Sequence, residues 1–334
     1  MDLRVIWFIL IGILFSGFFF LEGFDFGVGI LLIFLGKNDS ERRVIINTIG
    51  PFWDGNEVWL ITAGGAIFAA FPNWYATMFS GFYLALLLVL VALILRGVSF
   101  EFRSKIESEK WKSNWDKVIF VTSLLLALLF GVALSNLIKG VPIDKSMNYV
   151  GGFFDLISIY TLLAGITTLL VFTFHGAVFL SLKADKEMEE RALKIAKPLG
   201  IAAIISAVLL ALLSFLQTDL FKSNLALLAA IISILFLVLS FYLVSVKKAK
   251  IAMITNGLAI ALGVATLFLG LFPRVMVSSI ASVYNLTIYN ASSSNYTLSL
   301  MTKVALIFVP IVLGYQIWTY WIFRKRVTKK DVEY

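Results

Sequence analysis

The sequence predicts an all-α, polytopic membrane protein with nine transmembrane helices. Hydrophobic residues occupy 60% of its 334 positions and charged residues only 14%, against about 25% charged in an average soluble domain. Nine apolar runs are long enough to supply the roughly 20 residues that cross a bilayer core as a helix. The distribution of Lys and Arg between the connecting loops then orients the spans. A water-soluble enzyme is excluded, because a soluble fold could not bury so much apolar surface.

The apolar runs are expected to be helices, because lipid offers no partner for open backbone amides and the leucine-rich runs lack the alternation of barrel strands. The first run is about twice as long as the apolar part of a secretory signal, so we interpret it as a mature first span. In chain order the nine runs lie near Val5–Leu35, Ile49–Phe71, Tyr75–Leu95, Val118–Ile138, Phe154–Leu182, Leu199–Leu216, Leu225–Val246, Ile251–Phe272 and Val304–Phe323.

Basic residues gather on one side of the predicted membrane. The loops after odd-numbered spans hold 22 of the 28 Lys and Arg residues. The positive-inside rule therefore predicts that the N-terminus is outside the cell and the C-terminus is in the cytoplasm. The formal net charge of +8 then reflects this orientation, and we expect no nucleic-acid partner.

The span count predicts a single membrane domain over residues 1–334. Helices one to four (about 5–138) and five to eight (about 154–272) fit two four-helix bundles, with helix nine (about 304–323) as a peripheral helix. Gly64 and Gly65 on the second span favour close packing of helices. The outer segment 273–302 is too polar to span and is expected to form a surface loop or cap. Near the inner end of helix nine, three aromatic residues are typical of an interfacial belt: Trp318, Tyr320 and Trp321.

Four carboxylates fall well inside the apolar runs, and all four belong to the cytoplasmic half of the predicted membrane: Glu22 and Asp25 on the first span, Asp54 and Glu57 on the second. A charged residue at the bilayer centre costs roughly 2.5 to 3.5 kcal/mol on insertion scales, so four of them call for a reason. One interpretation is a proton relay from the cytoplasm toward a buried centre. The alternative is structural pairing with Arg96, at the inner end of the third span.

His175, late on the fifth span, is the only histidine in the chain. It could ligate haem iron, take part in proton transfer, or make a packed polar contact. Haem ligation is the least favoured of these interpretations, because a six-coordinate haem wants two axial side chains and the chain offers no second histidine. The absence of cysteine excludes disulfides and thiolate metal sites. The glycine-rich run from Gly23 to Gly29 follows no strand, so it is not a dinucleotide site.

Several runs of the sequence resemble subunit II of the cytochrome bd quinol oxidases. The runs that carry the resemblance are EGFDFGVGIL at Glu22–Leu31, GPFWDGNEVWLITAGGAIFAAFP at Gly50–Pro72, RGVSFEFR at Arg96–Arg103, HGA at His175 and NLTIYNASSS at Asn285–Ser294. The resemblance covers the whole chain, and the second run is very specific. It implies nine helices arranged as two four-helix bundles and a peripheral helix, in the membrane of a bacterial or archaeal cell.

The resemblance also implies a function and partners. It implies a heterodimer with a haem-bearing subunit I that carries two b-type haems and haem d, oxidises quinol and reduces oxygen to water. This chain would hold no haem, with a structural quinone as an optional ligand and a small single-span subunit left open. Asp25 and Asp54 would be acids of a cytoplasmic proton uptake route, with Glu57 nearby and Arg96 as an interface partner. Glu22 and His175 remain candidate polar or proton-linked residues.

Two other functions compete with this interpretation. A proton-coupled secondary transporter could use Asp25, Asp54 and Glu57, but the sequence lacks paired, interrupted spans in corresponding halves. A purely structural, quinone-binding scaffold subunit would need no proton role at all.

Overall fold

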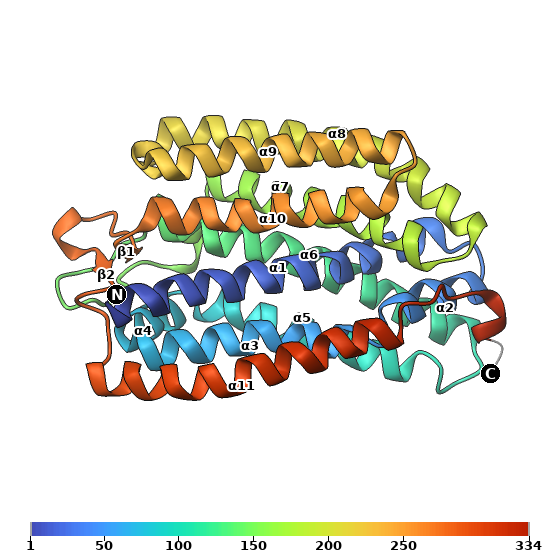
Figure 1. Cartoon of the computed structure of the whole chain (residues 1–334), viewed down its shortest axis with the longest axis horizontal. Helices are drawn as coiled ribbons and strands as arrows, with labels where there is room; N and C mark the ends of the chain where they lie inside the picture. The colour runs from blue at the N-terminus through green and yellow to red at the C-terminus, as the bar shows by residue number, and fades with distance from the viewer. Residues whose placement is uncertain (1, 333–334) are drawn as a thin grey trace.

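The computed structural model describes residues 2–332 and consists almost entirely of α-helices (Figure 1). The helices within this range are α1 (Leu3–Leu35), α2 (Asp39–Ile49), α3 (Trp53–Ala70), α4 (Pro72–Gly81), α5 (Tyr83–Phe102), α6 (Glu109–Lys139), α7 (Ile159–Lys183), α8 (Lys186–Gln217), α9 (Asn224–Ser245), α10 (Ala249–Leu271) and α11 (Asn295–Ile322). A two-stranded antiparallel sheet joins β1 (Arg274–Met276) to β2 (Leu286–Thr287).

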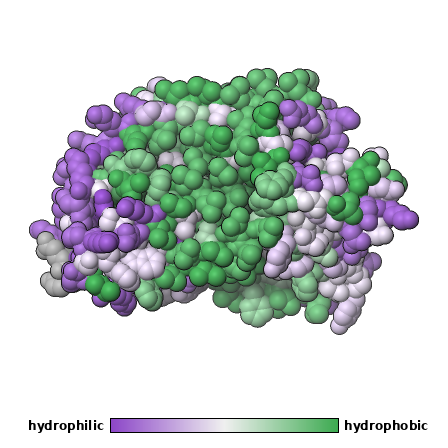
Figure 2. Space-filling view, turned by 180° about the vertical axis from the view of Figure 1, so that it is seen from behind, coloured by the Kyte–Doolittle hydropathy of each residue, from purple (hydrophilic) through white to green (hydrophobic). Residues whose placement is uncertain are grey.

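Eight of the described helices are long and apolar enough to cross a membrane, judged by length and composition. They are α1, α5, α6, α7, α8, α9, α10 and α11. Figure 2 shows the corresponding hydrophobic band, with polar residues gathered toward both ends of the molecule. The prediction of an all-α, polytopic membrane protein is confirmed. Helix α3 is not among the eight, because its first five residues include Asp54, Asn56 and Glu57.

Helix α1 lies at the centre of the helix packing. It contacts α3, α6, α7 and α10, while α7 also packs on α6 and α8, and α9 packs on α8 and α10. The crossing of α1 and α7 is close because Gly27 faces Gly176, and a Cβ added at Gly27 would lie 2.0 Å from the carbonyl oxygen of Phe172. Gly64 and Gly65, expected at close helix contacts, meet nothing within 4 Å in the described part of the chain. That expectation was wrong within this subunit.

Two of the predicted spans have different bounds in the structure. The run expected as one helix near 49–71 begins after a break at Gly50–Phe52, because Pro51 has no amide hydrogen to donate and restricts the residue before it. The preceding residues form the amphipathic helix α2. The run near 75–95 is split at Phe82 into α4 and α5, and α5 continues to Phe102.

The outer segment 273–302 forms a cap, and its last part is helical. The backbone amide of Ser278 donates to Asn285 Oδ1 at 2.8 Å, and the Ser293 amide donates to the Ala70 carbonyl at 2.9 Å. Helix α11 begins at Asn295, nine residues before the predicted start, because the side chain of Ser294 accepts a hydrogen bond from the Thr297 amide and caps the helix. The cap and the N-terminus lie at one end of the molecule, and α2 and the C-terminus at the other (Figure 1).

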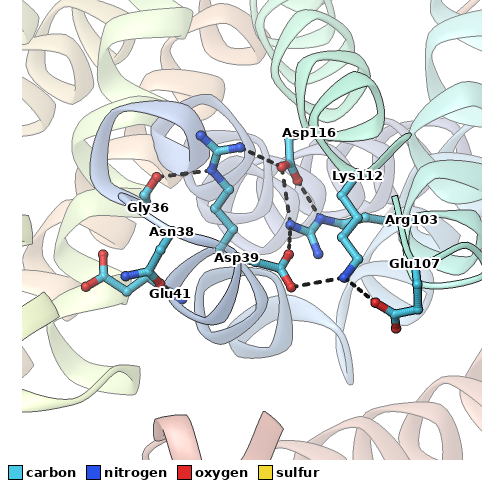
Figure 3. A network of polar contacts seen from close by, with 9 residues as sticks. Gly36, Asn38, Asp39, Glu41, Arg103, Glu107, Lys112 and Asp116 are labelled. Atoms are coloured by element: carbon cyan, nitrogen blue, oxygen red, sulfur yellow. Dashed lines mark hydrogen bonds and ion pairs between the residues drawn. The ribbon is translucent and has the colours of Figure 1, made fainter. Parts of the chain in front are cut away.

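At the end that holds α2, a network of ion pairs fixes this helix to α5 and α6 (Figure 3). The Arg103 guanidinium donates to Asp116 Oδ1 at 2.6 Å and to Asp39 Oδ1 at 2.8 Å. Arg42 also pairs with Asp116, and Lys112 lies between Asp39 and Glu107. Partial burial favours the neutral form of Asp39, but the hydrogen bonds and positive charges of Arg103 and Lys112 together outweigh it and lower the pKa of Asp39.

Candidate functional site

Helix α1 brings two carboxyl groups to one face in the middle of the apolar band. Glu22 and Asp25 are three residues apart and therefore project from the same side of the helix. Both side chains are completely buried. Each lies about 15 Å or more from either end of α1, at 1.5 Å per residue. The sequence placed these two acids in the membrane interior, and the structure places them against α3 and α5.

Arg96 of α5 joins the carboxyl groups of two helices. Its Nη1 atom donates to Glu22 Oε1 at 2.8 Å and to Glu57 Oε1 at 3.0 Å. The guanidinium is fully buried and lies over the rings of Phe26 and Phe100, 5.0 and 5.1 Å from their centroids. Arg96 is therefore a charge partner of Glu22 and Glu57 inside this subunit. This is the pairing that the structural alternative to a proton relay predicted.

Asp25 is bound to α3 through Asn56, a residue that the sequence analysis did not select. Asn56 Nδ2 donates to Asp25 Oδ2 at 2.5 Å. Its Oδ1 atom accepts from the Tyr320 hydroxyl at 2.9 Å and from Gln316 Nε2 at 3.4 Å, both on α11. Of the three aromatic residues expected in an interfacial belt, Trp318 and Trp321 are exposed, but Tyr320 points inward. The available signal was the spacing of Gln316 and Tyr320, four residues apart in an apolar run.

Asp54 lies apart from the buried acids. Its side chain is exposed and makes no hydrogen bond or ion pair within residues 2–332. Asp54 precedes Asn56 by two residues on α3, so it lies at nearly the same depth as Asp25. The structure therefore brings together Glu22, Asp25, Glu57 and Arg96, and leaves Asp54 on the neighbouring surface.

His175 belongs to α7 and contacts α1 at Phe20, away from the acid cluster. Its Nδ1 atom accepts from Asn256 Nδ2 at 2.9 Å, so the ring donates from Nε2 to the Phe20 carbonyl oxygen at 3.1 Å. The imidazole is completely buried and lies beside the rings of Phe20 and Phe24. Both ring nitrogens are thus engaged, which leaves neither free to bind haem iron. In the described residues no group of three His, Cys, Asp or Glu side chains could hold a metal ion.

Several polar atoms of the acid cluster have no partner in the described structure: Glu22 Oε2, Asp25 Oδ1, Arg96 Nε and Arg96 Nη2. Buried polar atoms are normally satisfied by protein or by ordered water. The cluster therefore keeps hydrogen-bonding capacity at defined atoms of Glu22 and Asp25.

A separate cavity of about 250 Å³ lies among α1, α6, α7, α8, α9 and α10. Its lining is mainly apolar and includes Phe19, Phe172 and Leu267, while Tyr160 and Ser214 place a hydroxyl pair, 3.0 Å apart, on its wall. The shape and lining suit an apolar molecule with one or two polar groups.

Comparisons with known proteins identify the family. The model of the cytochrome bd terminal oxidase subunit II family matches residues 3–323. Cytochrome bd ubiquinol oxidase subunit 2 of Bacillus subtilis is 47% identical over 332 residues, which cover 99% of this chain and 98% of that protein. Cytochrome bd-I ubiquinol oxidase subunit 2 of Escherichia coli is 39% identical over 374 aligned positions, covering 99% and 97%.

The fold is also similar to that of a solved structure. A chain in the structure of bd oxidase from Geobacillus thermodenitrificans superposes with a TM-score of 0.77 at 18% identity, over 96% of this chain and 99% of that chain. The helical arrangement is therefore shared beyond the sequence similarity. Together with the full-length matches in sequence, this shows that the chain belongs to the cytochrome bd terminal oxidase subunit II family.

Proposed function

We propose that this chain is the haem-free subunit II of a quinol:oxygen oxidoreductase, that it supports a haem-bearing subunit I, and that it takes up protons from the cytoplasmic side for the reduction of oxygen to water. The observation that carries the proposal is the buried cluster of Glu22, Asp25 and Glu57 around a single Arg96. Three carboxyl groups face one guanidinium, so the cluster is neutral only when two of them carry protons. Because uncompensated charge is costly inside a membrane, the cluster favours binding and passing on protons.

The position of Asp54 supports a contact with subunit I and an entry point to the proton uptake route. An exposed carboxylate at the depth of the buried cluster would be costly against lipid. We propose that subunit I covers this face of α3, where Gly64 and Gly65 also leave open space. In the assembled complex Asp54 would then lie at the subunit interface, with Glu57 one turn further along the same helix and Asp25 beyond Asn56.

The full layout belongs to the same proposal. Counting α3 as a span gives nine passes, which fit two four-helix bundles and α11 as the peripheral helix. An odd number of passes agrees with termini at opposite ends of the molecule (Figure 1). With most of the basic residues at the end that holds α2 and the C-terminus, we place that end in the cytoplasm and the N-terminus outside, in a bacterial inner membrane.

The apolar cavity supports a structural quinone as a ligand of this subunit. Its lining suits an isoprenoid tail, and the hydroxyl pair of Tyr160 and Ser214 could bind a ring oxygen. A bound quinone would fill the space among these six helices and stabilise their packing; we assign it no step in the reaction. The haems are expected in subunit I, and the arrangement of His175 agrees with this expectation.

The proton role is tested with Asp25→Asn and Asp54→Asn in the complete oxidase. Each variant should lower the rate of oxygen consumption with saturating quinol by about a hundredfold, the lower end of the loss expected when a positioned proton-transfer group is removed. The haem absorption spectrum and the yield of complex should stay normal. The matched control is Glu190→Gln, an exposed acid on α8, which should leave turnover unchanged. Normal turnover in both aspartate variants would leave only the scaffold role.

A further inference from the structure

The peripheral helix α11 is the last element expected to influence a buried acid, because only 6% of its apolar window is buried in this chain. Yet two of its side chains, Gln316 and Tyr320, point toward the acid cluster. They lie four residues apart and so share the face that meets α3. Both contact the same amide oxygen, Asn56 Oδ1, whose own Nδ2 atom is bonded to Asp25.

Trp59 sets the direction of the hydrogen bonds that run from it through Gln316 and Asn56 to Asp25. The indole Nε1 of Trp59 can only donate, and it donates to Gln316 Oε1 at 2.8 Å. The other end of that amide, Gln316 Nε2, is therefore a donor and faces Asn56 Oδ1. Asn56 Oδ1 must accept, so Asn56 Nδ2 must be the atom that donates to Asp25 Oδ2.

The direction of these hydrogen bonds makes the two oxygens of Asp25 different. One lone pair of Oδ2 accepts a hydrogen bond from Asn56 Nδ2, and this amide nitrogen cannot accept a hydrogen bond in return, so the contact favours Oδ2 without a proton. The other oxygen, Asp25 Oδ1, has no partner in the described structure. Protons therefore reach and leave Asp25 at Oδ1.

We infer that Tyr320 and Gln316 of α11 are positioning residues that act through Asn56 to hold Asp25 Oδ2 as a hydrogen-bond acceptor and confine proton exchange to Asp25 Oδ1. The inference rests on the proposed function of Asp25 and adds a role for α11. The Tyr320 hydroxyl makes the shorter of the two contacts to Asn56 Oδ1, and its ring stacks on Phe52 with the centroids 4.4 Å apart. Replacing tyrosine with phenylalanine should keep the stacking and remove only the hydroxyl.

The other groups that act on Asp25 can be named from the elements around it. Glu22 is on the same helix, Glu57 is on α3, Arg96 is on α5 and the phenol of Tyr320 is on α11. A substitution at Tyr320 leaves Glu22, Glu57 and Arg96 unchanged. A change in proton exchange in that variant is thus attributable to the hydrogen bonds of Asn56.

The test is a double-mutant cycle in the assembled oxidase, with Tyr320→Phe, Asn56→Ala and the pair. Tyr320→Phe should lower oxygen consumption about three- to fivefold, as expected for one lost hydrogen bond. Its effect should vanish in the Asn56→Ala background, because the tyrosine acts only through that amide. The control is Tyr315→Phe, an exposed tyrosine one turn earlier on α11, which should behave like the unmodified oxidase.

A spectroscopic readout separates positioning from a structural effect. The infrared carboxyl band that disappears in Asp25→Asn should shift in Tyr320→Phe and stay unchanged in Tyr315→Phe. Additive effects of Tyr320→Phe and Asn56→Ala, or an unshifted band, would overturn the inference while leaving the role of Asp25 intact. Normal turnover in both Asp25→Asn and Asp54→Asn would instead refute the proposed proton role itself.

Discussion

Arg96 is the residue on which the charge balance of the membrane interior depends. It is fully buried and pairs with carboxyl groups on α1 and α3. Replacing it with methionine removes the only cation of the cluster, and breaking a buried ion pair from one side costs about 3–5 kcal/mol. We therefore expect Arg96→Met to lower the melting temperature of the purified complex. The loss should shrink at low pH, where the carboxyl groups bind protons.

A compensating variant provides the control. Adding Glu22→Gln and Glu57→Gln to Arg96→Met removes the uncompensated acids, and the melting temperature should recover in part. An Arg96→Met complex that melts like the unmodified one would show that the guanidinium carries no stabilising role.

Some residues of the acid cluster could be predicted from the sequence and others could not. Buried acids could be predicted from their position in apolar runs, since membranes tolerate few charges without a reason. Asn56 and Tyr320 could not, because their contact joins positions 264 residues apart in the chain. A neutral polar side chain in an apolar run gives no comparable signal until its partner is known.

Among the helices, the crossing of α1 and α7 is the contact with the least room. Gly27→Ala would place a Cβ 2.0 Å from the Phe172 carbonyl oxygen and 2.9 Å from Gly176 Cα. Backbone atoms cannot yield as a side chain can, so the two helices would have to separate. We expect a severe loss of assembled complex, measured as the yield of haem-containing oxidase. Gly314→Ala on α11, where nothing lies within 4 Å of the added atom in the described chain, should leave that yield unchanged.

Helix α2 should make the stability of its end of the molecule depend on pH. The hydrogen bond from the Arg191 guanidinium lowers the pKa of Glu41 from 4.5 to about 2. A group whose pKa is depressed on folding stabilises the fold above its unfolded pKa, and that contribution is lost as the pH falls through the folded value. We expect the contribution, about 1–2 kcal/mol for a pair that retains some contact with solvent, to disappear between about pH 4.5 and 2.

Thermal unfolding of the complex across that range, in the unmodified protein and in Glu41→Gln, measures this contribution. The variant should melt earlier at pH 7, and the difference should close toward the acid end. A difference that stays constant with pH would contradict the assignment to the Glu41 carboxylate.

Element boundaries were harder to predict than element types. Apolar length alone started the second span at Ile49 and left the preceding residues as a loop, whereas these residues form the amphipathic helix α2, and Pro51 delays the start of α3 to Trp53. The early start of α11 depends on the Ser294 cap, a polar residue that hydropathy assigns to a loop.

For the molecule as a whole, the distribution of basic residues predicts an orientation in the membrane that single-cysteine labelling can test. The chain contains no cysteine, so an introduced thiol has no background in this subunit. Position 283 lies in the cap and position 330 near the C-terminus, and both are exposed, so Val283→Cys and Lys330→Cys are suitable variants.

If the N-terminus is outside, a maleimide that does not cross membranes should label Val283→Cys in intact cells. Lys330→Cys should react only after the membrane is permeabilised. Because α11 is the one predicted span between positions 283 and 330, the two sites lie on the same side only if α11 does not cross the membrane. Labelling of both from the same side would therefore refute the nine-pass layout, and the opposite pattern of access would refute the direction of proton uptake that depends on it.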